Sequence, residues 1–265
     1  MSTNKIILIT GATSGFGEAA ARKYVHTGNK VIISGRRKER LETLTDELGA
    51  HNCHTIHADI RDQKAMADAI AALPIAFQDI DVLINNAGIG AGIALAQDVA
   101  LKAWNDTLDT NVRGLLGVTH AVLPGMLRRN NGHILNIGST AAHYPQATGN
   151  VYAGTKAFVH QFSLSLRCDL LGTNLRVSCL EPGFCESDFT ATRLGDKVAG
   201  NAYYEGLDAP SSDEIAEIMY WLTSLPAHIN VNVLEVMPTR QALAGYALSR
   251  KNESSINFGA AISQN

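Results

Sequence analysis

Short apolar runs and longer amphipathic stretches alternate along most of this chain. The apolar runs are rich in isoleucine, valine and leucine, which is typical of strands buried on both faces of a sheet. They predict strands near residues 5–10, 30–34, 53–58, 81–86, 132–138, 175–180 and 231–236. The stretches between them predict helices near residues 16–27, 37–48, 62–73, 98–129, 151–172 and 211–224. Alternation of this kind gives an α/β fold whose parallel sheet carries helices on both faces and binds ligands at the carboxyl ends of its strands.

The same pattern predicts one domain. No linker rich in Pro, Gly or Ser, no internal repeat and no apolar run long enough to cross a bilayer interrupts the alternation. Residues 184–210 depart from it and are polar, as in a loop that closes over a small ligand. We therefore expect one domain over residues 1–250 and a tail over residues 251–265, either without fixed structure or in contact with a neighbouring subunit.

The composition argues against several classes of function. With 265 residues and 46% hydrophobic content the chain can bury one sizeable core, and its net charge of −3 offers no basic field for nucleic acid. The four cysteines lack metal-ligand spacing, and the chain starts directly into a core strand, so we predict a cytoplasmic protein. His51, His54 and His57 fall in a strand-like segment, where a loop or edge position is favoured over metal ligation. We expect no metal site, no nucleic-acid partner and no membrane association.

A glycine-rich turn, TGATSGFG, joins the first predicted strand to the first predicted helix. In such a turn Gly11 allows the sharp bend, Gly15 lets the backbone approach a pyrophosphate, and Gly17 lets the helix pack closely on the strand. The helix N-terminus adds unpaired N–H groups and the positive end of its dipole. The turn therefore indicates dinucleotide binding, although a glycine turn that merely ends a strand is the alternative.

The second predicted strand ends in Gly35, Arg36 and Arg37, where an NAD-selective site would place Asp or Glu. Two guanidinium groups suit a ribose 2′-phosphate, because arginine forms paired charge-assisted hydrogen bonds with phosphate oxygens. This favours NADP over NAD, against the alternative of a solvated basic helix start.

Tyr152 and Lys156 lie four residues apart in a predicted helix, so their side chains share one face. A free phenol has a pKa of about 10, and a nearby ammonium group favours the phenolate and lowers that pKa. Together with the hydroxyl of Ser139, the pair could serve a carbonyl that accepts a hydride. A tyrosine and a lysine at this spacing are common on any helix, so the interpretation depends on the other motifs.

These motifs occur together and in one order. The glycine turn is followed by NNAG at residues 85–88, Asn111, Ser139, the Tyr152 and Lys156 pair, and Pro–Gly at residues 182–183. With this order and spacing the chain resembles the short-chain dehydrogenase/reductase family from residue 5 to about residue 240. The resemblance implies a single-domain Rossmann fold with a doubly wound, seven-stranded parallel sheet. It also implies hydride transfer between NADP(H) and an alcohol or carbonyl, in a homotetramer or dimer.

The resemblance also implies roles for individual residues. Tyr152 would be the acid and base, Lys156 would lower its pKa and hold the nicotinamide ribose, Ser139 would position the substrate oxygen, and Asn111 would hold a water of the proton relay. Asp59 would contact the adenine amine. The full set expected at the dinucleotide is Gly11, Thr13, Ser14, Gly15, Phe16, Gly17, Arg36, Arg37, Asp59, Ile60, Asn85, Ala87, Gly88, Tyr152, Lys156, Pro182, Gly183 and Ser187.

Two arginines point to an anionic substrate. Arg193 lies in the polar segment and Arg240 follows the last predicted strand, and paired guanidinium groups would bind a carboxylate or sulfonate. Tyr144 could wall the pocket, and its neighbour His143 reads as structural. The residues expected at the substrate are Ser139, Tyr144, Tyr152, Arg193 and Arg240.

Within the family, the chain resembles bacterial NADP-dependent sulfoacetaldehyde reductases and 3-hydroxy acid dehydrogenases. The segment MPTRQ, which contains Arg240, favours reduction of sulfoacetaldehyde to isethionate. The alternative is a 3-hydroxy acid dehydrogenase acting on 3-hydroxypropionate, serine or allo-threonine, or reducing malonic semialdehyde. A protein that binds NADP without turnover is disfavoured, because the residues expected to be catalytic are all present.

Overall fold

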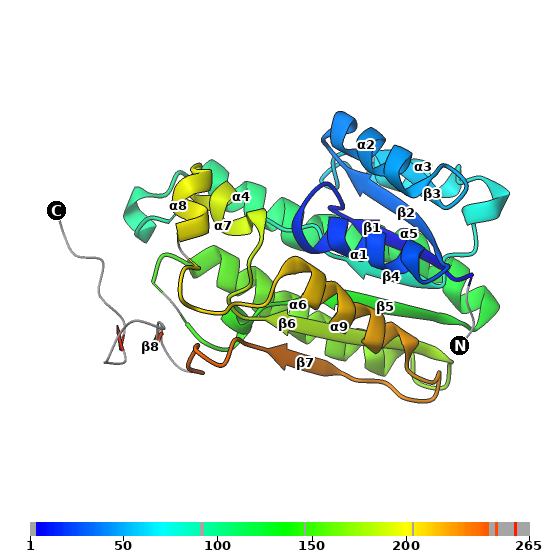
Figure 1. Ribbon diagram of the computed structural model, residues 1–265. Helices are drawn as coiled ribbons and strands as arrows, with labels where there is room; N and C mark the ends of the chain where they lie inside the picture. The colour runs from blue at the N-terminus through cyan, green and yellow to red at the C-terminus, as the bar shows by residue number, and fades with distance from the viewer. Residues whose placement is uncertain are drawn as a thin grey trace.

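The computed structural model describes residues 4–90, 93–145, 147–202, 204–243, 247–248 and 257–258. Its main element is a seven-stranded sheet in the order β3-β2-β1-β4-β5-β6-β7, and all its neighbouring strands are parallel (Figure 1). The strands are β1 (Ile6–Thr10), β2 (Lys30–Gly35), β3 (Cys53–His57), β4 (Val82–Asn85), β5 (Gly132–Ile137), β6 (Leu175–Pro182) and β7 (Val233–Val236). The predicted fold class is confirmed, because the strand order reverses beside β1 as in a doubly wound sheet.

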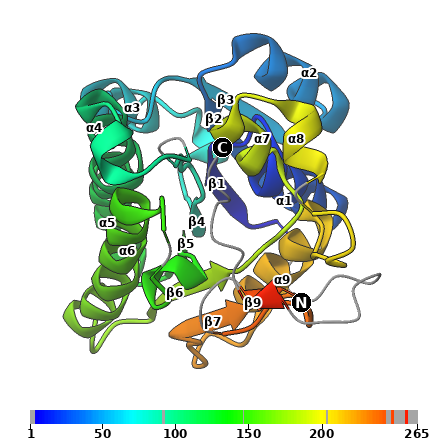
Figure 2. The ribbon, with the colours of Figure 1, turned by 90° about the vertical axis from the view of Figure 1, so that its left-hand side faces the viewer.

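Helices cover both faces of the sheet. One layer holds α1 (Gly15–His26), α2 (Lys38–Leu48) and α9 (Ser212–Ser224), and the other holds α3 (Gln63–Ala71), α5 (Leu115–Arg129) and α6 (Asn150–Asp169). Figure 2 shows α5 and α6 on one side of the sheet and α1 and α9 on the other. The two layers follow from strands that are apolar at consecutive positions, since each such strand must be covered twice.

Each face of the sheet has its own hydrophobic core. On β1, Ile7 and Ile9 join the cluster beneath α1, α2 and α9, and Leu8 joins the cluster beneath α3, α5 and α6. All three side chains are fully buried. The alternation follows from the two-residue repeat of a strand, in which successive side chains point to opposite faces.

Two segments differ from the sequence prediction. The single helix expected over 98–129 is divided into α4 (Leu101–Leu108), a π-helical segment η3 (Asp109–Gly114) and α5. The polar segment 184–210, expected to be a loop, contains α7 (Asp188–Leu194) and α8 (Lys197–Ala202), which lie beyond the carboxyl ends of the strands (Figure 1). Helical periodicity predicts neither, because all three segments are too short to show a clear period, with six residues in η3, seven in α7 and six in α8.

Most of the predicted tail, residues 251–265, lies outside the described residues. Of it, Asn257–Phe258 forms a strand, β9, that pairs antiparallel with Ala247–Leu248, β8. In the described part of the chain, no helix has the length and apolar character that a membrane crossing requires.

We predict that Ile32→Ala lowers the free energy of unfolding by about 2–5 kcal/mol, because the Ile32 side chain is fully buried in the core beneath α3, α5 and α6 and its loss leaves a cavity. Ile75→Ala is the matched control, since Ile75 is 89% exposed, and it should change stability by less than about 0.5 kcal/mol. Urea unfolding of both variants measures the difference. Equal effects would contradict the assignment of the core.

Candidate active site

One cavity of about 420 Å³ lies at the carboxyl ends of the strands. It runs from the glycine turn after β1, past the ends of β2, β4, β5 and β6, to α7. Most residues expected at the dinucleotide line it, namely Gly11, Thr13, Ser14, Gly15, Phe16, Arg36, Arg37, Asp59, Ile60, Ala87, Gly88, Tyr152, Lys156, Pro182, Gly183 and Ser187. Asn85 and Gly17 are not part of its lining.

The glycine turn is shaped by a close approach of β1 to β4. Gly11 has a φ of 69°, and a Cβ placed on it would lie 2.8 Å from the Cα of Ala87, which is backbone and cannot move aside. A Cβ on Gly17 would lie 2.7 Å from the carbonyl oxygen of Gly11. Any side chain at either position would therefore push the turn away from the sheet. The residues fit a dinucleotide, because the bare turn leaves the start of α1 open to the cavity.

Arg37 is anchored on the glycine turn. Its guanidinium donates to the hydroxyl of Thr13 at 2.7 Å, the carbonyl of Thr13 at 3.0 Å and the hydroxyl of Ser14 at 2.7 Å. Arg36 lines the same end of the cavity, and its backbone carbonyl contacts the ring of His57 at 3.1 Å. The two arginines thus place positive charge beside the turn, where the sequence predicted a 2′-phosphate.

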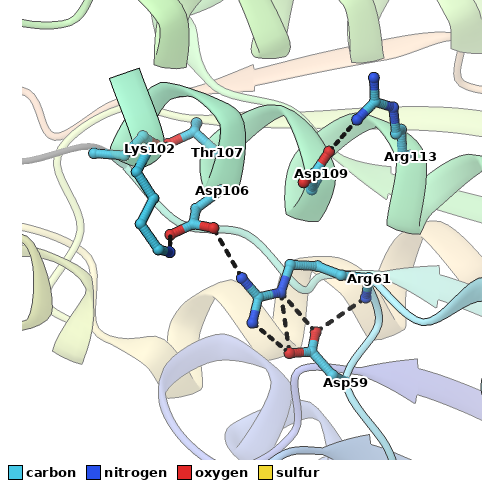
Figure 3. A network of polar contacts seen from close by, with 8 residues as sticks. Asp59, Arg61, Lys102, Asp106, Thr107, Asp109 and Arg113 are labelled. Atoms are coloured by element: carbon cyan, nitrogen blue, oxygen red, sulfur yellow. Dashed lines mark hydrogen bonds and ion pairs between the residues drawn. The ribbon is translucent and has the colours of Figure 1, made fainter. Parts of the chain in front are cut away.

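Asp59, expected at the adenine amine, belongs to a network of ion pairs (Figure 3). Arg61 binds its carboxylate with Nη2 at 2.6 Å and also donates to Asp106 of α4 at 3.0 Å. The hydrogen bonds from Arg61 lower the pKa of Asp59, so Asp59 is a carboxylate that can accept a hydrogen bond from an amine. The network also joins the loop after β3 to α4.

The structure places Asn85 in the interior rather than at the cavity. Its Nδ2 donates at 2.9 Å to Asn136 on β5 and at 2.9 Å to Thr119 on α5, and its side chain is buried. The second asparagine of NNAG, Asn86, lines the cavity instead and donates to the carbonyls of Thr10 at 2.9 Å and Gly11 at 3.2 Å. The prediction therefore missed Asn86, although the alternation of side chains along β4 could have distinguished the two neighbours.

Three residues expected to be catalytic meet at the middle of the cavity. Ser139 follows β5, its hydroxyl accepts from the backbone N–H of Ala141 at 3.2 Å, and Tyr152 and Lys156 come from the first turns of α6. Lys156 donates to the carbonyl of Ile137 at 2.7 Å, and its Nζ lies 5.7 Å from the centroid of the Tyr152 ring. The fold thus holds a hydroxyl, a phenol and an ammonium group side by side.

The pKa of Tyr152 differs from the sequence prediction. Burial raises it above its ordinary value, and the hydrogen bond with Ser139 and the charge of Arg193 lower it only in part. Burial also lowers the pKa of Lys156 to about 8. Lys156 was expected to lower the pKa of the phenol, but its ammonium group donates its hydrogen bond to the carbonyl of Ile137. Desolvation of the phenolate outweighs the effects that lower the pKa of Tyr152. At neutral pH Tyr152 is therefore a neutral phenol.

Asn111 lies in the π-helical segment and is buried. Its side chain accepts from the N–H of Ile89 at 2.8 Å and donates to the carbonyl of Ile89 at 2.8 Å and to Thr155 at 3.0 Å. It therefore ties the segment after β4 to α6, and its expected contact with a relay water stays a prediction. π turns in α-helices are frequent at functional sites.

The substrate end of the cavity is formed by α7 and the segment after Ser139. Arg193, Tyr144 and Phe189 line it, and the Phe189 ring lies 5.3 Å from that of Tyr152. Arg193 donates to the carbonyl of Thr148 at 2.7 Å, and its charge acts on Tyr152. A cation and the phenol therefore share one compartment.

Arg240, the other arginine expected at the substrate, does not line the cavity. Its Nε pairs with Asp208 at 3.3 Å. The next residue, Gln241, lines the cavity and accepts at 2.8 Å from the N–H of Phe184. The prediction of Arg240 as a substrate residue is thus not supported by its position. Its neighbour was missed because a segment outside regular structure gives no pattern from which to tell which side chain points inward.

Comparison with known proteins decides the family. The sequence profile of the short chain dehydrogenases matches residues 5–197. The chain belongs to the short chain dehydrogenase family. It is 51% identical to serine 3-dehydrogenase of Agrobacterium fabrum, over 93% of this chain and 98% of that protein. It is 49% identical to NADP-dependent 3-hydroxy acid dehydrogenase of Salmonella typhi, over 92% and 99% of the two chains.

Solved structures of family members agree with the fold. A closed form of serine dehydrogenase complexed with NADP+ superimposes with a TM-score of 0.88 at 46% identity, covering 93% of this chain and 100% of the other. Serine dehydrogenase from Escherichia coli superimposes with a TM-score of 0.80 at 45% identity, over 89% and 99% of the two chains. The predicted family, fold and class of enzyme are confirmed. These dehydrogenase relatives support the 3-hydroxy acid alternative rather than sulfoacetaldehyde reduction.

We predict that Asn85→Ala reduces stability by about 1–3 kcal/mol, because the oxygen of Asn136 is left buried without its donor. Since Asn85 does not line the cavity, the folded variant should bind NADPH as the wild type does. Asn86→Ala is the matched variant and should weaken NADPH binding, because Asn86 lines the cavity and supports the glycine turn. Urea unfolding and fluorescence titration separate the two effects. A large loss of NADPH affinity in folded Asn85→Ala would restore the original assignment.

Proposed function

We propose that this protein is an NADP-dependent dehydrogenase of short 3-hydroxy acids, which oxidises the hydroxyl-bearing carbon to a carbonyl and catalyses the reverse reduction. The observation that carries the proposal is the set of residues that line one cavity. At its centre lie Ser139, Tyr152 and Lys156, at one end lies Arg193, and at the other end Arg36 and Arg37 lie beside the glycine turn. A dinucleotide, a reacting carbon and a carboxylate thus each have a complementary group.

The chain's own residues fit NADP(H). Gly11 and Gly15 keep the turn bare beside the start of α1, and Arg36 and Arg37 supply two positive charges where a ribose 2′-phosphate would lie. The cofactor, when bound, would accept or donate the hydride. Relatives named as NADP-dependent and a relative solved with NADP+ support this choice.

The protons are handled by Tyr152. As a neutral phenol it can donate a proton to the carbonyl oxygen of a substrate that is being reduced, and as a phenolate it can take the hydroxyl proton in the opposite direction. Ser139 would hold the same oxygen by a hydrogen bond. Lys156 would stabilise the phenolate once proton transfer has begun, because charge interactions are strong in a site that excludes water.

The carboxylate of the substrate would bind to Arg193. A guanidinium group binds a carboxylate with two hydrogen bonds, and Arg193 lies in the compartment of the Tyr152 phenol. A 3-hydroxy acid carries its carboxylate two carbons from the reacting carbon, so one small molecule can meet both groups. Relatives named serine 3-dehydrogenase and 3-hydroxy acid dehydrogenase support this class of substrate.

Sulfoacetaldehyde is the less supported substrate. Its choice rested on Arg240, which pairs with Asp208 away from the cavity lining.

The homotetramer or dimer and the cytoplasmic location stay predictions.

The direct test measures kcat/KM with NADP+ for serine, allo-threonine and 3-hydroxypropionate, and with NADPH for malonic semialdehyde and sulfoacetaldehyde. We expect the carboxylate substrates to be preferred over sulfoacetaldehyde. A clear preference for sulfoacetaldehyde would overturn the proposed substrate and leave the reaction class intact.

Arg193→Ala should raise KM for the preferred 3-hydroxy acid about tenfold to a hundredfold, because a hydrogen bond to a charged group contributes about 1.5–3 kcal/mol. A neutral alcohol of similar size should be almost unaffected, since it lacks the carboxylate. Arg193→Lys should restore part of the effect, because an ammonium group lacks the planar fork. Arg240→Ala is the matched control and should leave KM unchanged. Equal losses for acid and neutral alcohol would indicate damage to α7 rather than a lost carboxylate contact.

Tyr152→Phe should lower kcat about a hundredfold to ten-thousandfold, because the transferable proton is lost while the ring and its packing on Phe189 are kept. NADPH binding, followed by the fluorescence of the bound dinucleotide, should persist. Activity within about tenfold of the wild type would exclude Tyr152 as the acid and base.

Replacing Arg36 and Arg37 together with serine should weaken NADPH binding far more than NADH binding, because only NADPH carries the 2′-phosphate. We expect about a tenfold loss or more for each contact that disappears. Thr13→Val is the matched control, since it removes one hydroxyl that anchors Arg37 and leaves both charges in place. An unchanged ratio of NADPH to NADH affinity in the double variant would place cofactor choice elsewhere.

A further inference from the structure

Just outside the cavity, a buried carboxylate lies between two histidines. Glu181, near the end of β6, is fully buried. His143 Nε2 lies 2.8 Å from one of its oxygens and His160 Nδ1 lies 2.8 Å from the other. The two imidazole rings are perpendicular, with centroids 4.5 Å apart. None of these residues lines the cavity, and the mechanism above does not use them.

The fold brings these residues together from three elements. Glu181 is the penultimate residue of β6, His160 lies on α6, and His143 follows the 3₁₀ turn Thr140–Ala142. Gly138 makes room for the carboxylate, because a Cβ at this position would lie 2.8 Å from the Cγ of Glu181. The cluster therefore depends on long-range packing, which explains why sequence spacing predicts no metal ligands here.

The side chains around the cluster leave its ligand set intact. Cys179 donates its thiol hydrogen to Glu181 at 3.5 Å, but the group of candidate ligands whose atoms lie within 4.8 Å of one another does not include it. Glu181 raises the pKa of Lys156, against the larger effect of burial. Tyr144 packs its ring against His143 and donates to Glu235 at 3.4 Å. Two imidazoles and one carboxylate are the groups that can face an ion.

We propose that His143, His160 and Glu181 form a binding site for a divalent transition-metal ion of the zinc class. Two imidazole nitrogens and one carboxylate are a ligand set that Zn²⁺ uses at sites with an open fourth position. All candidate ligand atoms lie within 4.8 Å of one another. His143 is 35% exposed, which gives the ion a path from solvent and leaves room for a water ligand.

Accepting the ion requires local movement of the three side chains, whose ligand atoms lie within 4.8 Å of one another. Tetrahedral bonds of about 2.0–2.1 Å separate the ligand atoms by about 3.3 Å, so the contacts of 2.8 Å would open by about half an ångström. Each imidazole must also turn its lone pair toward the ion, which requires the tautomer protonated on its other nitrogen. Mg²⁺ and Ca²⁺ are disfavoured, because they prefer oxygen ligands throughout.

An ion at this site would connect the segment after Ser139 to β6 and α6, the elements that carry Pro182 and Lys156. It would also neutralise the carboxylate that supports the Lys156 ammonium. A bound ion would thus change the charge and the packing next to the catalytic residues, although it contacts none of them.

The test uses the full, untagged chain, because a polyhistidine tag binds the same ions. Zn²⁺ titration against a chromophoric chelator should give one equivalent per chain, and Co²⁺ should give the visible absorption of a four- or five-coordinate site. Zn²⁺ should also raise Tm in proportion to its occupancy. His143→Asn and His160→Gln should each weaken binding about a hundredfold or more, since loss of an outer partner alone costs 10–100-fold.

His120→Gln and His228→Gln are the matched controls, because both histidines are exposed and lie outside the cluster. Both controls should keep the Co²⁺ spectrum and the rise in Tm. Thermal unfolding without metal checks that His143→Asn and His160→Gln are folded. The proposal is overturned if the wild type shows no saturable binding, or if both cluster variants bind as tightly as the wild type. None of these readouts depends on the proposed substrate or on turnover.

Discussion

Lys156 keeps an ammonium group almost out of contact with water, at 6% exposed, and the arrangement around it follows from that burial. An isolated buried charge is costly, and here burial lowers the pKa of Lys156 to about 8. The carbonyl of Ile137 accepts one of its hydrogen bonds, and the carboxylate of Glu181 favours the charged form. Without these partners the amine would lose its proton more easily, and the phenolate of Tyr152 would lose its counter-charge.

Glu181 is likewise a buried ionisable group, and its charge is negative where that of Lys156 is positive. A fully buried carboxylate is tolerated when hydrogen-bond donors and positive charge surround it, and His143, His160 and Lys156 provide them. Gly138 lets this carboxylate approach, since a side chain there would collide with Glu181. The residue before Ser139 thus has a role in packing that a sequence motif does not express.

The fold and the centre of the site could be predicted because they depend on local patterns. Apolar strands alternating with helices determine the sheet, and in a parallel sheet all carboxyl ends meet at one edge, which brings Gly11, Ser139 and Pro182 together. The errors concern side-chain direction and solvation. Asn85 points inward because of how β4 packs beside β5 and α5, and Arg240 lies against Asp208 because of a distant loop.

The predicted direction of the Tyr152 pKa shift was wrong for a related reason. Spacing places Lys156 on the same helix face, but only the packed structure shows that the phenol is buried and that the ammonium donates to Ile137. The cluster of Glu181 with two histidines is invisible in the sequence, because its members are 17 and 21 residues apart along the chain (143 to 160, and 160 to 181).

The anchoring of Arg37 on Thr13 and Ser14 has a consequence for engineering. The arginine that would recognise the dinucleotide phosphate also braces the turn that would receive the pyrophosphate. Exchanging it to redirect the enzyme toward NADH therefore removes a support of the turn together with a positive charge. A redesigned variant would need a new brace at position 13 or 14, and Gly11 offers no freedom for one, because the backbone of Ala87 occupies the space beside it.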